Sequence, residues 1–118
     1  MTTWNAKTIC LSLFLFIVAG LFEIGGGYLI WIGIKKNFKP SLTLPLGAIV
    51  LVAYGFIPTL QPIDSSDFGR VFAVYGGFFI VGSYIWGYIF DNMKIDLGDY
   101  IGCCIAIVGV LIAWFWKR

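Results

Sequence analysis

Residues 8–34 of this chain read TICLSLFLFIVAGLFEIGGGYLIWIGI, an apolar run whose single charged residue is Glu23. A helix of about 20 mostly apolar residues crosses the hydrocarbon core of a bilayer, because each residue adds about 1.5 Å. The run exceeds the roughly 7–15 apolar residues of a secretory signal, and Glu23 interrupts it. This stretch therefore predicts a retained transmembrane helix.

The rest of the chain has the same apolar character. Of its 118 residues, 60% are hydrophobic, 12% are charged and none is histidine, whereas soluble domains average roughly 45–50% apolar and about 25% charged residues. A water-soluble fold is excluded because one small core could not bury so much apolar surface. The sequence predicts an all-α membrane protein with one four-helix transmembrane domain over residues 1–118, with spans at about 8–34, 41–60, 71–90 and 100–116.

Several classes of function conflict with this composition. The absence of histidine removes the commonest general base and the commonest metal ligand. Cys10, Cys103 and Cys104 lie inside the spans without the spacing of metal ligands. The net charge of +2 comes from short clusters and makes no basic face for nucleic acid. We therefore expect no enzyme, no metal, no cofactor and no nucleic-acid partner.

The positive charges give no clear orientation in the membrane. With four spans, each side receives four of them: Lys7, Arg70, Lys117 and Arg118 on one side, and Lys35, Lys36, Lys39 and Lys94 on the other. Lysine and arginine bias normally sets topology. The balance favours dual insertion and an antiparallel homodimer, which the small volume enclosed by four helices also favours. The alternative is a single orientation fixed by the free amino terminus or by early folding of the first hairpin.

Glu23 is the candidate functional residue, since it lies two residues, or about 3 Å, from the middle of its span. A carboxylate at that depth costs a few kcal/mol, so such residues usually face a bundle interior or a wet cavity. There it could bind either a proton or a cation. Small residues one turn away predict an open notch around it, namely Ala19, Gly20, Gly26 and Gly27. A structural glutamate, protonated and hydrogen-bonded between helices, is the alternative.

Four aromatic residues are expected to line the same cavity: Tyr54 in the second span, and Phe72, Tyr75 and Trp86 in the third. The last three belong to one stripe of the third helix, at spacings of three and four residues, that also includes Gly76, Phe79 and Ser83. Aromatic faces attract organic cations, each by about 0.5–2 kcal/mol. Because 19% of the chain is aromatic, packing or anchoring at the membrane interface is the alternative role for each.

Small residues in the last two spans predict a helix bend and a contact between two copies of the chain. The pair Gly76-Gly77 is a candidate bend in the third helix, with close packing as the alternative. The fourth span carries a stripe of small residues at spacings of four, three and four: Gly102, Ala106, Gly109 and Ala113. Such stripes let helix backbones approach closely in a membrane, so we assign this one to dimer packing.

Several segments together resemble a known family. They are Glu23-Ile24-Gly25, Tyr28-Leu29-Ile30-Trp31, Thr59-Leu60-Gln61-Pro62, residues 69–77 (GRVFAVYGG) and Asp99-Tyr100-Ile101-Gly102. They look like the YnfA family of small four-helix proteins of the inner membrane. That family is similar to the small multidrug resistance transporters, which work as antiparallel dimers and exchange protons for toxic cations.

The resemblance implies roles for particular residues. The essential acid of the multidrug transporters would correspond to Glu23, and their third-helix aromatic pair to Phe72 and Tyr75. Their helix kink would fall near Gly76-Gly77. A tyrosine gate in their second helix would correspond to Tyr54, and their dimer motif would overlap residues 109–113. Here Tyr75 replaces a tryptophan of those transporters and Phe72 replaces a tyrosine.

The leading functional hypothesis is thus proton-coupled efflux of small organic or aromatic cations across the cell's inner membrane. Its partners would be a small cationic substrate, protons, the lipid bilayer and a second copy of the chain, with the proton gradient as energy source. Two alternatives belong to other classes: a small ion channel, and an accessory subunit of a larger membrane complex.

Overall fold

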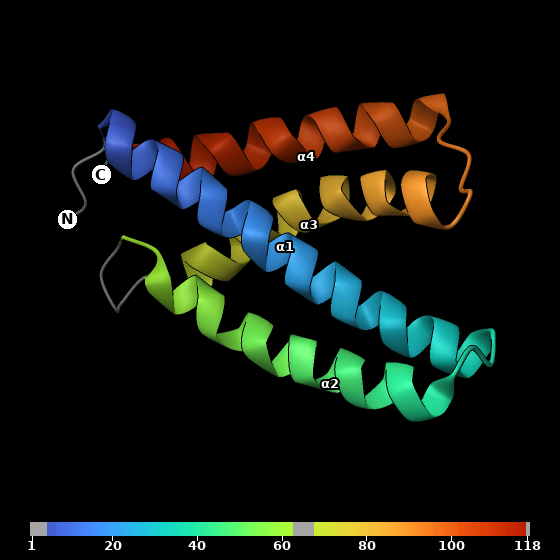
Figure 1. Ribbon diagram of the computed structural model, residues 1–118. Helices are drawn as coiled ribbons and strands as arrows, with labels where there is room; N and C mark the ends of the chain where they lie inside the picture. The colour runs from blue at the N-terminus through green and yellow to red at the C-terminus, as the bar shows by residue number, and fades with distance from the viewer. Residues whose placement is uncertain (1–4, 63–67, 118) are drawn as a thin grey trace.

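The computed structural model describes residues 5–62 and 68–117, and contains helices but no strand within them. In chain order these are α1 (Ala6–Lys35), α2 (Pro40–Phe56), the short 3₁₀ helix η1 (Ile57–Leu60), α3 (Phe68–Phe90) and α4 (Leu97–Phe115). The all-α fold expected from the sequence is confirmed (Figure 1). Arg118, which entered the charge count, lies outside the described residues.

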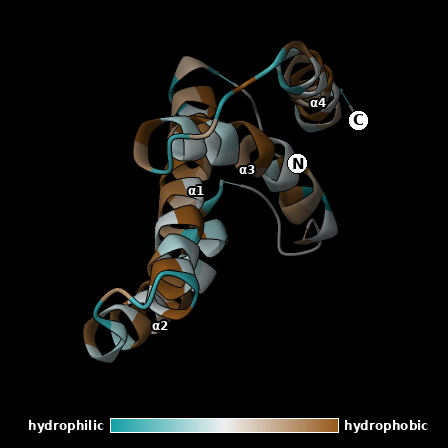
Figure 2. Ribbon diagram, turned by 90° about the vertical axis from the view of Figure 1, so that its right-hand side faces the viewer, coloured by the Kyte–Doolittle hydropathy of each residue, from teal (hydrophilic) through white to brown (hydrophobic). Residues whose placement is uncertain are grey.

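Four helical segments are long and apolar enough to cross a membrane: α1, α2 continued by η1, α3 and α4. Figure 2 shows that apolar residues predominate along the helices, while hydrophilic residues concentrate in the connections between them. Such a surface belongs in lipid, where a helix satisfies its own backbone hydrogen bonds. The chain is therefore a multi-pass membrane protein.

Local chemistry sets where the helices begin and end. Capping boxes start two of them: Asn5 caps α1 and pairs with Thr8 in its first turn, and Asp96 caps α4 and pairs with Asp99. Helix α4 therefore begins at Leu97, earlier than the sequence suggested. The second span changes from α to 3₁₀ geometry at Ile57–Leu60. The second residue of that segment, Pro58, has no backbone N–H to continue the α-helical ladder.

The helices form two antiparallel hairpins, α1–α2 and α3–α4 (Figure 1). Helix α1 packs against both α2 and α3, and α3 packs against α4, so α1 and α3 form the centre. The start of α1 and the end of α4 lie at one end of the bundle. The connections after α1 and α3 lie at the other, and they turn through left-handed residues at Asn37, Lys39 and Asn92.

Glycines bring α1 and α2 into backbone contact. A Cβ atom added to Gly47 would lie 2.8 Å from the carbonyl oxygen of Gly26 and 2.9 Å from Ile30 Cγ1. One added to Gly33 would collide with the Thr43 hydroxyl group. Small residues permit such close approach of helices in a membrane. The sequence Gly25-Gly26-Gly27 therefore serves α1–α2 packing through its middle member.

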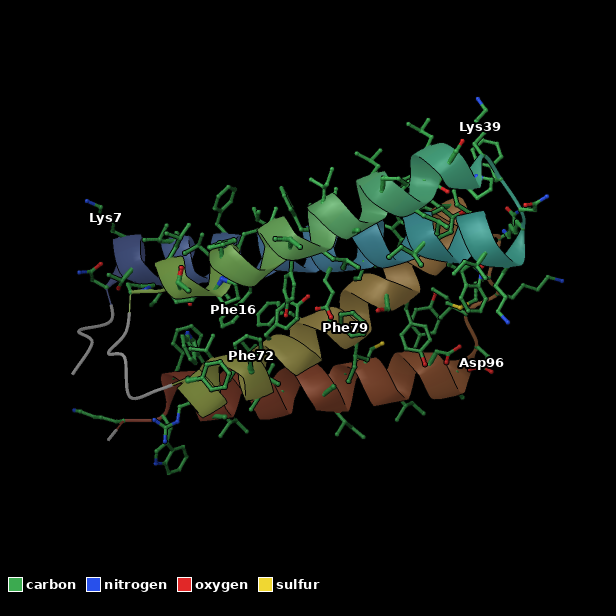
Figure 3. The ribbon with its side chains drawn as sticks, turned by 90° about the horizontal axis from the view of Figure 1, so that it is seen from below. Lys7, Phe16, Lys39, Phe72, Phe79 and Asp96 are labelled. Atoms are coloured by element: carbon green, nitrogen blue, oxygen red, sulfur yellow. The ribbon has the colours of Figure 1, made fainter. Side chains whose placement is uncertain are left out.

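The buried core lies between the two hairpins. It consists of Phe16 and Ala19 of α1, Val71, Val74 and Tyr75 of α3, and Trp114 of α4. Figure 3 shows Lys7 at one end of the bundle, Lys39 and Asp96 at the other, and Phe16, Phe72 and Phe79 between them. The Phe16 ring stacks on Phe78 at 5.1 Å and meets Trp114 edge-on at 5.2 Å. This packing joins α1, α3 and α4.

Two polar contacts join the two hairpins at the end of the bundle where α1 and α3 finish. Lys36 Nζ lies 2.6 Å from Asp91 Oδ1, and the Tyr28 hydroxyl group donates to the Phe90 carbonyl oxygen at 3.1 Å. Asp91 raises the pKa of Lys36 above its ordinary value of 10.5, chiefly through this hydrogen bond. Lys36 therefore keeps its positive charge at neutral pH, and its contact with Asp91 connects the end of α1 to the end of α3.

Candidate functional site

Glu23 lies on α1 where helices α1, α2 and α3 meet. Its carboxyl group interacts with the hydroxyl groups of two tyrosines, Tyr54 from α2 and Tyr75 from α3. Its Oε2 atom is buried and accepts no hydrogen bond from any residue that the structure describes. An unpaired buried oxygen costs roughly 1–3 kcal/mol, and more if it is charged. The carboxyl group thus has one oxygen available to a ligand.

Tyr75 is the most closely held residue of this site. Its side chain is 5% exposed, and its hydroxyl group donates to the Ala19 carbonyl oxygen at 3.3 Å. Its ring lies 5.5 Å from the Tyr54 ring and 6.2 Å from the Phe79 ring. Residues from three helices therefore fix the position of this hydroxyl group beside Glu23.

Neighbours from one turn away shape the space around the acid. Added Cβ atoms at Gly20 and Gly27 would meet no atom within 4 Å, so both positions are sterically open. At Gly26 an added Cβ would lie 2.9 Å from Leu51 Cγ of α2. Ala19 is 1% exposed and carries the carbonyl group that Tyr75 contacts. Of the small residues predicted to form a notch, Gly26 instead contacts α2.

The four predicted cavity aromatics occupy different places. Tyr54 and Tyr75 are beside the acid, as described above. Phe72 is 37% exposed and packs on Phe68, with ring centroids 4.6 Å apart. Whether Phe72 contacts a substrate therefore stays a prediction.

Trp86 packs on the second half of α1. Its ring would lie 3.3 Å from a Cβ added at Gly25, and its centroid is 5.8 Å from Tyr28 and 4.5 Å from Phe90. Its Nε1 atom is buried and finds no acceptor among the described residues. Trp86 thus offers a hydrogen-bond donor between α1 and α3, closer to the Lys36 end of the bundle.

The glycine pair of the third span has two environments. Helix α3 is continuous through Gly76-Gly77. A Cβ added to Gly77 would collide with the Val110 side chain of α4, whereas one at Gly76 would meet open space. Gly77 therefore allows α3 and α4 to pack closely, and a bend at this pair stays a prediction.

The two glycines in the small-residue stripe of α4 face open space. Gly102 and Gly109 are exposed, and added Cβ atoms there would meet nothing within 4 Å. Ala106 is half-buried, and Ala113 packs against the core. The two glycines are thus accessible to lipid or to a second copy of the chain.

One buried polar cluster was not expected from the sequence. The Trp114 indole donates from Nε1 to Ser12 Oγ at 2.8 Å, and Gln61 donates from Nε2 to the Ser12 carbonyl oxygen at 3.1 Å. All three side chains are at most 6% exposed. A serine inside an apolar span was the only signal, and it does not indicate which residues pair with it. No group of three or more potential metal ligands occurs within the described ranges.

Comparison with known proteins places these features in a family. A family model described as "Uncharacterised BCR, YnfA/UPF0060 family" matches residues 9–118. A UPF0060 membrane protein of Clostridium beijerinckii is 52% identical over 107 residues, which is 91% of this chain and 95% of that protein. UPF0060 membrane protein YfjF of Bacillus subtilis is 44% identical over 108 residues, 92% of this chain and 96% of that one. No solved structure gives a significant match.

Proposed function

The chain belongs to the YnfA/UPF0060 family of membrane proteins, and we propose that it exports small organic or aromatic cations in exchange for protons. The observation that carries this proposal is the Glu23 carboxyl group. It lies within a membrane span, faces two tyrosine hydroxyl groups, and has a buried oxygen without a partner among the described residues. Its chemistry suits two ligands that compete, a proton and a cation.

Exchange of a proton for a cation follows from the free-energy cost of an unpaired carboxylate inside the membrane. A deprotonated Glu23 between apolar helices needs a counter-charge, which a bound organic cation supplies. Protonation removes the negative charge and with it the attraction that holds the cation. A protein that rearranges between inward and outward access only when the site is occupied would couple the two fluxes. The proton gradient supplies the energy, and the mechanism needs no cofactor and no enzymatic step.

The proposed transporter is an antiparallel homodimer with two copies of Glu23. The equal distribution of positive charges on the two sides supports dual insertion. The open positions at Gly102 and Gly109 of α4 leave room for a second helix to approach. Within one chain the Glu23 site is formed by α1, α2 and α3, so α4 is available for association.

The test is cation-driven proton movement in liposomes that contain the purified protein. An outward gradient of tetraphenylphosphonium, and in a second series of guanidinium, should drive protons inward with the wild-type chain. The isosteric substitution Glu23→Gln should abolish this movement to the level of protein-free liposomes. Glu23→Asp keeps the carboxyl group and serves as the matched control, so it should retain pH-dependent exchange.

Other outcomes would refute exchange. Proton movement by Glu23→Gln at the wild-type rate would remove the acid from the mechanism. Cation flux that does not respond to a pH gradient would instead indicate a channel.

A further inference from the structure

The position of the Tyr75 hydroxyl group has a consequence for the protonation of Glu23. A tyrosine hydroxyl group has one proton to donate and can also accept a hydrogen bond. In the structure its proton is directed at the Ala19 carbonyl oxygen, 3.3 Å away. In that arrangement the phenolic oxygen can offer only its lone pairs to Glu23. It can therefore accept a hydrogen bond from a neutral Glu23 carboxyl group, but it cannot donate one to a carboxylate.

Helix geometry brings the three groups together. Ala19 and Glu23 are four residues apart on α1, and side chains on a helix lean toward its N-terminus, so the Glu23 side chain extends over the Ala19 turn. Tyr75 reaches the same turn from α3 and interacts with the carboxyl group. Of the titratable groups on neighbouring elements, those that interact with Glu23 in the described structure are Tyr54 of α2 and Tyr75 of α3.

The contact between Tyr75 and Ala19 is easily exchanged. At 3.3 Å it is longer than the usual 2.7–2.8 Å or so of an O–H···O hydrogen bond. The Ala19 carbonyl oxygen also accepts the backbone N–H of Glu23 in the α-helix, so it keeps a partner if Tyr75 leaves. A hydrogen bond to a carboxylate is roughly twice as strong as a neutral one. Once Glu23 ionises, rotation of the hydroxyl group toward it is therefore favoured.

We infer that the Tyr75 hydroxyl group is a two-position switch, which donates to the Ala19 carbonyl oxygen while Glu23 is protonated and to the Glu23 carboxylate once the proton has left. Tyr75 keeps its own proton in both positions, and the proton that Glu23 releases passes to water. This inference rests on the proposed function, in which Glu23 titrates. It assigns to Tyr75 a positioning role, because the hydrogen bond between Tyr75 of α3 and the Ala19 carbonyl group of α1 exists in only one protonation state.

The chain itself offers an unusually direct test. Glu23 is its single glutamate, so ¹³C-labelled glutamate gives one side-chain carboxyl signal. Ala19-Gly20 is its single Ala-Gly pair, so ¹³C-carbonyl alanine combined with ¹⁵N-glycine isolates the Ala19 carbonyl signal. Both can be followed by NMR against pH in the full chain, in detergent or lipid. The wild type, Tyr75→Phe and the matched control Tyr54→Phe would be compared.

In the wild type and in Tyr54→Phe, the Ala19 carbonyl shift should change with the same midpoint as the Glu23 carboxyl shift. In Tyr75→Phe, Glu23 should still titrate, while the Ala19 response should lose most of its amplitude. The part that remains measures the effect transmitted through the helix. An Ala19 response of equal size in the wild type and in Tyr75→Phe would overturn the switch.

These measurements need no transport, so they separate the two proposals. A Glu23 carboxyl signal that stays flat between pH 4 and 10 would overturn both proton coupling and the switch. Co-titration of Glu23 and Ala19 in a protein that moves no cation would support the switch and count against export. Unchanged helical circular dichroism in Tyr75→Phe would show that the variant is folded, since it differs from the wild type by one oxygen atom.

Discussion

Replacement of Gly47 by alanine should weaken the contact between α1 and α2. The new Cβ atom would lie 2.8 Å from the Gly26 carbonyl oxygen, which is 0.6 Å short of ordinary contact (3.4 minus 2.8). It would also lie 2.9 Å from Ile30 Cγ1 and 3.1 Å from Leu29 Cβ. The backbone oxygen and the Leu29 β-carbon can move only with the helix itself. The two helices must therefore separate along their whole glycine-lined contact.

The cost follows from two opposing effects. Overpacking of this kind lowers the free energy of unfolding by about 1–3 kcal/mol. Alanine in place of glycine also favours a helix by up to about 1 kcal/mol. Gly27→Ala isolates the second effect, because its Cβ atom would meet nothing within 4 Å. We expect Gly47→Ala to be about 1–3 kcal/mol less stable than Gly27→Ala.

Reversible unfolding in mixed micelles measures this difference. The purified variants would be titrated with sodium dodecyl sulfate in a mild detergent, with tryptophan fluorescence as the signal. Trp114 packs against Phe16 in the core, so its emission reports on tertiary contacts. If Gly47→Ala and Gly27→Ala unfold at the same detergent fraction, the close approach of α1 and α2 is not present in the protein.

Two further predictions concern the ends of the bundle. Trp114→Phe removes the donor to Ser12 Oγ, a residue with no exposed surface, and should cost about 1–3 kcal/mol. Because this variant lacks the Trp114 reporter, its detergent titration would be followed by helical circular dichroism. If Ser12→Ala added to it recovers nothing, the hydrogen bond is not the cause. Lys36→Met should lower stability slightly at low salt and not at high salt, because the pair with Asp91 is exposed and screened. Since Asp91 raises the pKa of Lys36, the wild type should keep this stabilisation at neutral pH and lose it only as the pH rises through that raised pKa. If Lys36→Met had the same effect on stability at every salt concentration and pH, the ion pair would be contradicted.

Much of the fold could be predicted because membrane spans are decided locally. Length, hydropathy and the positions of charges identify each span without knowledge of its neighbours. The structure adds detail at the ends, where Pro58 accompanies a change to 3₁₀ geometry within the second span and Asp96 caps α4 so that it begins at Leu97 rather than at about residue 100. Glu23 could be singled out for the same reason, since a charge within a span is costly wherever it points.

The partners of Glu23 could not be predicted in the same way. Helical periodicity shows that Phe72 and Tyr75 share a face of α3, but not which part of that face meets α1. The structure brings Tyr75 to the Ala19 turn, while Phe72 packs on Phe68. The contacts of Trp86 with Gly25 and Tyr28 likewise depend on how far α3 is shifted along α1.

The sequence by itself determined that this protein is four membrane helices with one acid inside them. The reason is that the free energy of transferring a residue from water to lipid depends on that residue and its near neighbours. Only the tertiary structure decided what surrounds the acid. Gly26 and Gly27 are adjacent and chemically identical, yet the first contacts α2 and the second is open. The physical reason is that the two residues point about 100° apart around α1, and only the packing of whole helices determines which direction is filled.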